Sequence, residues 1–302
     1  MTKAADVLSI GVPALRFVRD NAPGAEVHVL THGDGVRIMQ LAEPSVPLRQ
    51  LSGGNWPDDF LQGMEAFLDT AEGIINEGYT QIINLDTAFL PCFLARFLKD
   101  AGQTVAGNWL SMAVPDLIDA IQRQTLTADF VNSAENYLQS SWLSMHQWHT
   151  EWWANMTPPD YGYAEFYLRR CCGFSAIRVD MQLPLPAQVK RDTVAVYLPD
   201  YPYLDSLMAS LARAGIDTFS VPADALRHDA LTGIQQSRLL VTQPALSFWL
   251  ARAMDTATLL VPGELEPRVL MPDYAAEPAL TPTPVEVLSE GIVSLMRGSH
   301  EA

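Results

Sequence analysis

Short apolar segments alternate with amphipathic segments through residues 1–110, and this alternation limits what the chain can fold into more than any other feature. Residues 27–30, 81–85 and 104–107 are rich in Val, Ile and Leu and predict short strands, of which 81–85 is expected to be buried. Apolar residues three or four positions apart predict helices around them, over residues 8–21, 33–42, 60–77 and 89–99. Strands that alternate with helices form parallel sheets covered on both faces, so we predict an α/β fold with a doubly wound sheet.

A second region of the same kind follows residues 183–186, where the sequence Leu-Pro-Leu-Pro is typical of a stiff, extended linker. Strands are predicted over residues 193–198, 218–221, 237–241 and 258–261, and helices over 203–213, 245–254 and 284–296. Two α/β domains are the usual arrangement for a chain of this length. We therefore predict domains at 1–182 and 183–302, the first ending in a helical, Trp-rich segment at about 110–180.

Composition excludes several classes of partner. The 302 residues include 35 acidic and 19 basic side chains, and the formal net charge of −16 makes nucleic acid an unlikely ligand, since nucleic-acid sites are basic. No apolar run reaches the roughly 18 to 20 residues that span a bilayer, and no signal peptide is recognisable at the start. We expect a cytoplasmic protein without a transmembrane segment.

Metal and cofactor sites are not expected. The three cysteines, Cys92, Cys171 and Cys172, lack the spacing of a zinc site and are interpreted as reduced thiols. His146 and His149 are three positions apart, as metal ligands on one helix would be, but no third ligand accompanies them. The tryptophans around them favour an aromatic segment that packs on a neighbouring helix, and the alternative is a surface that holds the apolar part of an acceptor.

Asp6 is the first candidate functional residue. Pro13 is suited to the first turn of a helix, where its missing N–H costs nothing, and Asp6 is expected in a loop ahead of that helix. An acid in such a loop lies at the carboxyl ends of the strands, where open α/β sheets bind ligands. The alternative is an acid that only stabilises the start of a helix through the macrodipole.

These residues resemble the heptosyltransferase-like glycosyltransferases of family 9. The family's Gly-Asp-Val-Leu loop corresponds to residues 5–8, its Pro-Ala-Leu to 13–15 and its Pro-x-Ala-x-Ile/Val-x-Val-Leu strand to 23–30. Further similarity lies at 82–85, 95–97, 105–107, 163–173 and 263–267. The resemblance covers most of the chain and is divergent.

The resemblance implies the GT-B fold, in which two Rossmann-like doubly wound domains face a central cleft. It also implies inverting, metal-independent transfer from a nucleotide sugar, with ADP-heptose among the candidates, to a glycan, lipid or protein acceptor, as in lipopolysaccharide biosynthesis. Asp6 falls on the carboxylate that deprotonates the acceptor hydroxyl. Ser9 and Asp86 are expected on the acceptor side. The expected donor-binding residues are Thr242, Gln243, Ser247, Trp249 and Glu266.

Three departures from the family support a second interpretation. The family's first strand would precede Ala5, where only four residues are present, so either the strand lies upstream of Met1 or the sheet lacks it. The Asn-Asp-Thr/Ser-Gly-x-x-His signature is replaced at 243–249 by Gln-Pro-Ala-Leu-Ser-Phe-Trp. The Gly-Ala-Ser turn and its basic residue are replaced at 199–202 by Pro-Asp-Tyr-Pro, where Asp200 would repel a diphosphate. The alternative function is therefore a catalytically lapsed, glycosyltransferase-like binding or scaffold protein.

Overall fold

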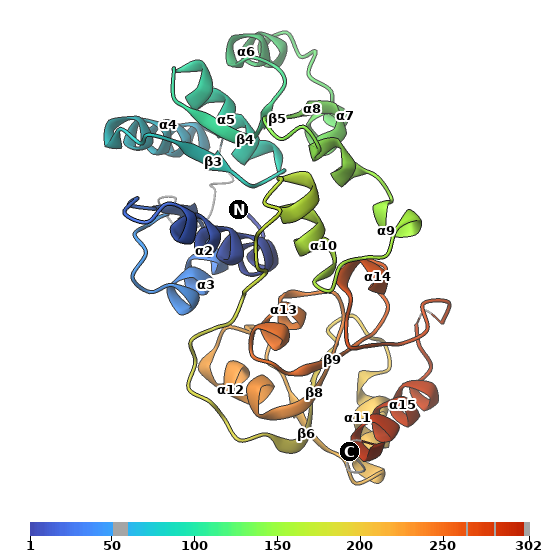
Figure 1. Cartoon of the computed structure of the whole chain (residues 1–302). Helices are drawn as coiled ribbons and strands as arrows, with labels where there is room; N and C mark the ends of the chain where they lie inside the picture. Colours follow the sequence, from blue (N-terminus) through green and yellow to red (C-terminus); the bar gives the residue numbers. More distant parts are fainter. Residues whose placement is uncertain (51–59, 264, 281, 299–302) are drawn as a thin grey trace. The chain divides into compact units, whose positions relative to one another are not determined.

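A computed structural model describes residues 1–50, 60–263, 265–280 and 282–298 (Figure 1). The chain forms two compact units. Unit 1 comprises residues 1–40, 45–155 and 166–178, and unit 2 comprises residues 41–44, 156–165 and 179–302. The main division falls between residues 178 and 179, where the sequence predicts 182 and 183, and the short segment 156–165 packs with unit 2.

Unit 1 contains two small sheets instead of one. The strands β1 (Val29–Thr31) and β2 (Leu48–Gln50) form a parallel pair. In the other sheet β3 (Ile82–Asn84) pairs in parallel with β4 (Val105–Leu110), and β4 pairs antiparallel with β5 (Leu138–Ser140). Within the described residues no strand pairs with the second edge of β1 or of β3. The prediction that residues 81–85 form a buried strand is wrong, because Ile83 at this open edge is 39% exposed.

The first helical segment begins earlier than the sequence indicates. The elements α1 (Ala4–Asp6), η1 (Val7–Gly11) and α2 (Val12–Asn21) follow one another without a break, and the Val7 N–H donates to the Lys3 carbonyl at 3.0 Å. η1 is a π-helix in which the Val12 N–H donates to the Val7 carbonyl, five residues back. This wide turn directly precedes Pro13, which has no N–H to donate. The expected loop around Asp6 is therefore wrong, since Asp6 lies in the first turn of a helix.

The remaining helices of unit 1 include three that the periodicity predicts. They are α3 (Asp34–Ala42), α4 (Phe60–Glu77) and α5 (Phe89–Asp100). The segment expected to be helical at 110–180 is broken into short pieces and contains β5, so that prediction is correct only in part. Its helices are α6 (Val114–Gln122), α7 (Ala128–Asn132), α8 (Ala134–Tyr137), η2 (Met145–His149), α9 (Trp152–Asn155), α10 (Gly162–Glu165) and η3 (Phe166–Cys171).

Two tryptophans of this segment, Trp148 and Trp152, pack on η3, as the packing interpretation predicts. The Trp152 ring stacks on Phe166 with 4.0 Å between centroids, and Trp148 meets Tyr167 edge to face at 4.7 Å. Both Phe166 and Tyr167 are buried. The aromatic cluster therefore belongs to the core of unit 1.

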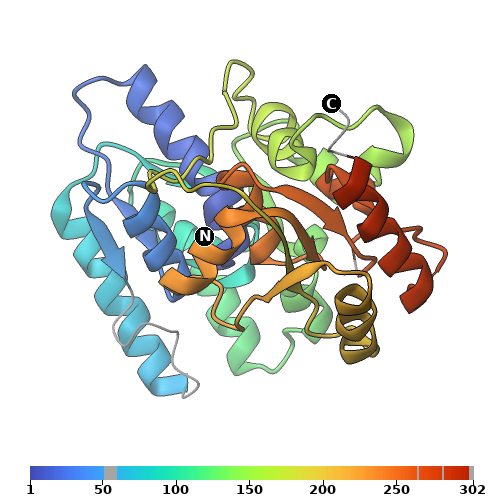
Figure 2. The same ribbon diagram turned by 90° about the horizontal axis from the view of Figure 1, so that it is seen from below.

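Unit 2 has one parallel five-stranded sheet in the order β10-β9-β8-β6-β7. Its strands are β6 (Arg191–Tyr197), β7 (Asp217–Ser220), β8 (Ser237–Thr242), β9 (Ala257–Leu260) and β10 (Tyr274–Ala275). Its helices after α10 are α11 (Leu204–Arg213), α12 (His228–Gln236), α13 (Leu246–Ala253), α14 (Pro267–Leu270) and α15 (Val285–Gly298). α11 and α15 lie side by side, as Figures 1 and 2 show.

The core of unit 2 joins this helix pair to one face of the sheet. Val194, Leu239 and Leu259 from three neighbouring strands pack in one cluster with Leu207 of α11 and Ile292 of α15. All five side chains are buried. The predicted strands and helices of this unit match the structure to within a few residues, because each carries a local apolar pattern.

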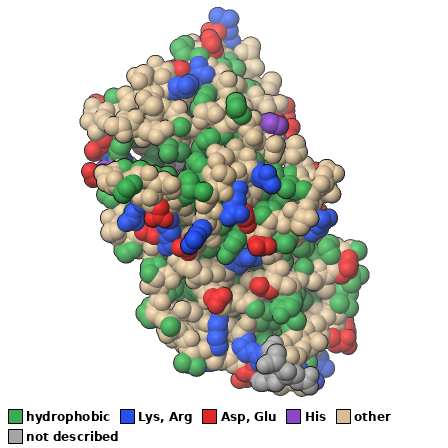
Figure 3. Space-filling model, in the orientation of Figure 1, with side chains coloured by type: hydrophobic (Ala, Val, Ile, Leu, Met, Phe, Trp, Pro, Cys, Tyr) green, Lys and Arg blue, Asp and Glu red, His purple; other side chains and the backbone are tan. Residues whose placement is uncertain are grey.

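The surface agrees with the acidic composition. On the face that Figure 3 shows, Lys and Arg side chains are scattered among acidic and hydrophobic ones and form no large basic patch. None of the described helices is long and apolar enough to cross a membrane.

Candidate functional site

The carboxyl ends of β1 and β3 lie on either side of the first two residues. The Thr31 hydroxyl, at the end of β1, donates to the Met1 carbonyl at 2.9 Å. The Thr2 N–H donates to the Asp86 carboxylate at 2.5 Å, and the Met1 ammonium lies 3.8 Å from the same carboxylate. Asp86 also accepts from the Ala88 N–H at 2.9 Å. We call this group the carboxyl edge of unit 1.

A buried polar network lies behind this edge. The Asn108 side-chain amide donates to the Tyr167 hydroxyl at 2.8 Å, and that hydroxyl donates to the Leu85 carbonyl at 2.7 Å. Asn84 donates to the Asn108 carbonyl at 2.8 Å. Burial raises the pKa of Tyr167 well above its ordinary value, so the phenol remains protonated and able to donate. The network joins β3, β4 and η3 and fixes the backbone that carries Asp86.

The predicted acceptor-side residues differ in their surroundings. Asp6 is half-buried within α1, and Ser9 lies in η1 with no exposed surface. Asp86 is 6% exposed and faces the carboxyl edge of unit 1 through the bonds above. Their roles stay predictions.

His32 is a candidate that the sequence reasoning missed. It follows β1 directly, and its pKa is lowered first by burial and then by the Met1 ammonium, while Asp86 acts in the opposite direction. An imidazole immediately after a short predicted strand was the available signal, because strand ends of α/β sheets are where ligands bind.

Three of the predicted donor-binding side chains lie inside unit 2. Thr242 ends β8 and Ser247 lies in the first turn of α13. Their hydroxyl oxygens are 2.8 Å apart, and neither residue has exposed surface. Trp249 is 2% exposed and meets Tyr163 edge to face at 5.2 Å and Phe248 at 4.9 Å. In this structure these side chains stabilise the turn between β8 and α13 and have almost no surface to offer a ligand.

The other two lie at the surface of the loops after β8 and β9. The Gln243 side-chain oxygen accepts from the Asp200 N–H at 3.2 Å, which joins the loop after β8 to the loop after β6. Glu266 is exposed and precedes α14. Gly263 approaches Pro244 so closely that a Cβ there would lie 2.8 Å from the proline ring. We call these three loop ends the carboxyl edge of unit 2.

Two arginines, Arg252 and Arg268, lie in the helices that follow the loops of the carboxyl edge of unit 2. Arg252, in α13, already donates to the carbonyls of Met271 at 2.5 Å and Asp160 at 3.2 Å. Arg268, in α14, is exposed and follows Glu266 by two positions. Among the described residues no group of three His, Cys, Asp or Glu side chains is placed to hold a metal ion.

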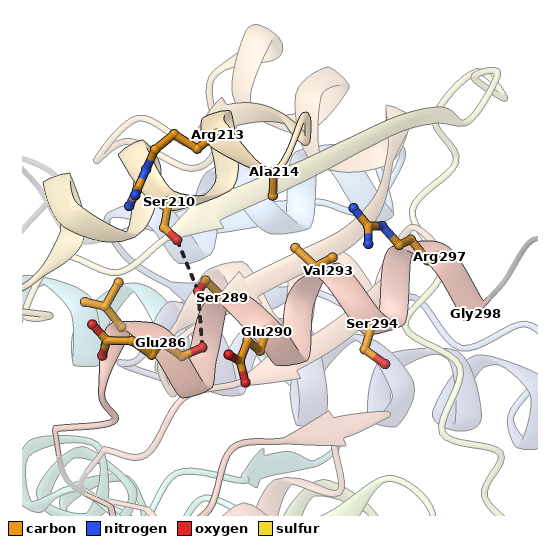
Figure 4. A pocket seen from close by; sticks show the side chains of 11 residues that line it. Ser210, Arg213, Ala214, Glu286, Ser289, Glu290, Val293, Ser294, Arg297 and Gly298 are labelled. Carbon is orange, nitrogen blue, oxygen red and sulfur yellow. Dashed lines mark hydrogen bonds between the residues drawn. The ribbon is translucent and has the colours of Figure 1, made fainter.

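A polar groove of about 890 Å³ lies elsewhere in unit 2, between α11 and α15 (Figure 4). The Ser210 hydroxyl donates to Ser289 at 3.2 Å across it, and Arg213, Glu290 and Arg297 also line it. It contains none of the predicted site residues, and its charges are of both signs. We do not include it in the candidate site.

Comparison with known proteins gives solved structures only. No family model and no curated protein matches the sequence. The structure is similar to that of the E. coli heptosyltransferase WaaC with ADP, with a TM-score of 0.57 and 12% identity over 97% of this chain and 99% of that one. WaaC with ADP-2-deoxy-2-fluoro heptose gives a TM-score of 0.56 at the same identity and coverage.

A second enzyme gives the same result. The E. coli ADP-heptose lps heptosyltransferase II has a TM-score of 0.52 and 12% identity over 100% of this chain and 98% of that chain. At this identity the likeness establishes the fold and not the activity. The chain has the GT-B fold of the heptosyltransferases, an α/β architecture with two Rossmann-like domains.

Proposed function

We propose that the protein is a glycosyltransferase that moves a sugar from a nucleotide sugar to an acceptor hydroxyl. The observation that carries this proposal is the structural correspondence with WaaC, which extends over nearly the whole length of both chains. Because both domains correspond, we infer that the chain keeps both a donor-binding domain and an acceptor-binding domain. A fold alone does not determine function, so this remains a proposal.

On the acceptor side we propose Asp6 as the general base. It is the half-buried acid at the start of the helical segment that follows the carboxyl edge of unit 1. Its carboxylate would take the proton of the acceptor hydroxyl while that oxygen attacks the anomeric carbon opposite the leaving diphosphate, which inverts the configuration without a metal ion. Asp86 and Ser9 would position the backbone around the acceptor through the bonds and packing described above.

On the donor side we propose an ADP-sugar, with ADP-heptose as the first candidate because WaaC was solved with an analogue of it. Gln243, which is half-buried, and Glu266, which is exposed, are the predicted donor residues with surface left to hydrogen-bond sugar or ribose hydroxyls, and Thr242, Ser247 and Trp249 would support them from beneath. Arg268 is the exposed cation nearest in sequence for the diphosphate. A cytoplasmic location, a glycan, lipid or protein acceptor, and a place in lipopolysaccharide biosynthesis stay predictions.

Thermal-shift titration with ADP, ADP-heptose and UDP-sugars tests donor binding. A ligand at 100 times its Kd should stabilise the protein by about 2.7 kcal/mol. We expect stabilisation by ADP and ADP-sugars, and a smaller effect in Arg268→Ala. The absence of a shift with every nucleotide sugar at millimolar concentration would refute the proposed activity.

The base is tested separately. Asp6→Asn should abolish transfer and leave donor binding intact, whereas Asp20→Asn, a matched change of an exposed acid on the same helical segment, should alter neither. Unchanged turnover in Asp6→Asn would remove Asp6 from this role.

The catalytically lapsed alternative rests on a specific observation. Pro244 fills the space beside Gly263, three predicted donor residues are buried, and Asp200 lies at the same edge. Such an edge is poorly suited to a diphosphate, because it offers a carboxylate and a ring where donors are needed. Binding of a sugar or nucleotide without transfer to any acceptor would favour this alternative.

A further inference from the structure

The outer side of the helix pair α11 and α15 carries four charged side chains. Arg213 of α11 and Glu286, Glu290 and Arg297 of α15 line the polar groove between the two helices, and all four are exposed (Figure 4). Within the part of the chain that the structure describes, none of the four forms an ion pair. We call this side of unit 2 the α11–α15 face.

The spacing along α15 keeps its acids away from its base. Glu286 and Glu290 are four positions apart, so they are neighbours on the helix surface and repel each other. Arg297 comes seven positions after Glu290, about 10.5 Å along the helix axis, which is too far to offset this repulsion. Three and four positions before Arg297 are Ser294 and Val293, which are uncharged. In the described part of α15, therefore, neither kind of charge has an opposite charge within reach on its own helix.

This spacing suits a second copy of the same helix. Val293 and Ser294 lie midway between Glu290 and Arg297. Two α15 helices that run antiparallel, with a twofold axis at this midpoint, place Glu290 of each copy opposite Arg297 of the other. A twofold axis repeats every contact, so one complementary pair of charges in the sequence gives two ion pairs in the dimer.

The net charge of the face also favours a second copy over other partners. Its two acids and two bases cancel, whereas the whole chain has 35 acidic and 19 basic residues. Copies of a chain with a formal net charge of −16 repel each other over most of their surfaces, and a neutral face lets them approach. An acidic partner would be matched by a basic face and a basic partner by an acidic one, and this face is neither.

The size of the contact predicts a weak dimer. α15 has 14 residues and is therefore about 21 Å long. Small side chains between the charges, Val293 and Ser294 of α15 and Ala214 of α11, let a second helix approach closely. Even so, a pair of short helices buries less than the roughly 1,200 Å² of a stable interface, which places the contact among the weak and transient ones.

We propose that the α11–α15 face joins two copies of this chain in an antiparallel dimer, in which Glu290 of each copy pairs with Arg297 of the other. The unpaired charges are what a partner can satisfy, and their seven-residue separation identifies that partner as the same helix reversed. The proposal concerns unit 2 alone. It goes beyond the proposed transfer reaction, which does not depend on a dimer.

Sedimentation velocity of the full chain, from about 1 to about 200 µM, tests the dimer, because a contact of this class has a dissociation constant in the micromolar range or above. We expect monomers at the lowest concentration and an increasing share of dimers toward the highest. Arg297→Glu should weaken dimerisation at least about tenfold, because like charges would then face each other twice. Arg227→Glu, the same change at an exposed residue before α12 and outside the groove, should have no effect.

A second variant separates pairing from damage to the helix. Arg297→Glu also places an acid at the C-terminal end of α15, where the macrodipole disfavours it. Glu290→Arg has the opposite effect on the helix, since it replaces the repulsion with Glu286 by an attraction four positions apart. It should nevertheless weaken dimerisation as much as Arg297→Glu does, because two bases would then face each other.

Mixing the two variants is the decisive experiment. Glu290→Arg and Arg297→Glu should each be monomeric alone and should form a mixed dimer together, because each facing pair then contains one acid and one base. The double variant with both changes should dimerise like the unchanged protein. The proposal is overturned if the unchanged protein is monomeric at about 200 µM, if Arg297→Glu dimerises equally well, or if the two variants stay monomeric when mixed.

Discussion

The polar network behind the carboxyl edge of unit 1 predicts a large difference between two tyrosine substitutions. Tyr167→Phe removes a hydroxyl that accepts from Asn108 at 2.8 Å and donates to the Leu85 carbonyl at 2.7 Å. Tyr137→Phe removes one that donates only to the Thr87 carbonyl, at 2.7 Å. Both residues are buried, with 1% and 4% of their surface exposed, so the two changes are matched in size and chemistry.

The magnitudes follow from the partners left behind. A buried donor or acceptor that loses its partner costs about 1 to 3 kcal/mol. Tyr167→Phe removes the donor to the Leu85 carbonyl and the acceptor of one Asn108 N–H, while the same amide nitrogen keeps its bond to the Asp86 carbonyl at 3.2 Å. We expect a loss of about 2 to 4 kcal/mol in the free energy of unfolding for Tyr167→Phe, and about 1 kcal/mol for Tyr137→Phe.

Urea unfolding followed by tryptophan fluorescence measures both losses. Trp109, Trp142, Trp148, Trp152 and Trp153 lie in unit 1, as do both tyrosines, so the signal reports mainly on the unit that changes. If Tyr167→Phe costs no more than Tyr137→Phe, the network does not hold β3, β4 and η3 together as argued. Equal slopes of the unfolding free energy against urea are needed for the comparison to stand.

Three further outcomes follow from packing and burial. Gly162 and Gly215 both have positive φ, so a change to Ala at either position should cost roughly 1 to 2 kcal/mol of backbone strain. A Cβ at residue 162 would also lie 2.2 Å from the Val269 carbonyl oxygen, whereas one at 215 would contact nothing. Calorimetry should therefore show that Gly162→Ala destabilises unit 2 much more than Gly215→Ala does. Burial raises the pKa of Cys171 to about 12, so a thiol reagent at pH 8 should modify it only after unfolding. The protonated Cys171 thiol should contribute fully to the free energy of unfolding below pH 9, the pKa of the thiol in the unfolded chain. This contribution should decline as the pH rises from 9 toward 12. Trp152→Ala should cost about 3 to 5 kcal/mol in the urea assay, through loss of its stack in the core.

Local patterns predicted the helices and strands of this chain better than their assembly. The helix at 60–77 agrees with α4 in both bounds, because four-residue spacing of apolar groups acts within the segment itself. Strand β5 was missed, since Leu138–Ser140 has no strand pattern and forms only by pairing with β4. The exposure of Ile83 was also missed, because it depends on the open edge beside β3 and not on residues 81–85.

The candidate site was predictable only in outline. Residue types at strand ends pointed to Asp86 and to the turn after β8, since strand ends can be read from the sequence. Which side chains reach the surface could not be read: Ser247 and Trp249 look polar or amphipathic, yet the turn between β8 and α13 places both inside. Asp6 was assigned to a loop because Pro13 suggested a helix start, and the π-helix that accommodates Pro13 leaves no signature in the sequence.

Charge at the carboxyl edge of unit 1 acts on His32, beside the proposed acceptor site. The Met1 ammonium, after burial, is the second cause that lowers the pKa of His32, and it lies 3.8 Å from Asp86. Acetylation of the Met1 amine would remove this positive charge and leave the Asp86 carboxylate to raise the pKa of His32.

We therefore expect the pKa of His32, measured by NMR titration of its ring protons, to be higher in the acetylated protein than in the free amine. His149 is the internal control, because its pKa is lowered by burial and raised by Glu135 and does not depend on the ammonium, so it should be the same in both proteins. A lower or unchanged pKa of His32 would mean that the ammonium does not act on this imidazole. A higher value would mean that His32 is protonated over a wider pH range once the ammonium charge is removed. Below its raised pKa, His32 would then be a cation at the edge where the acceptor is proposed to bind. It could accept the acceptor's proton in place of Asp6 only above that pKa.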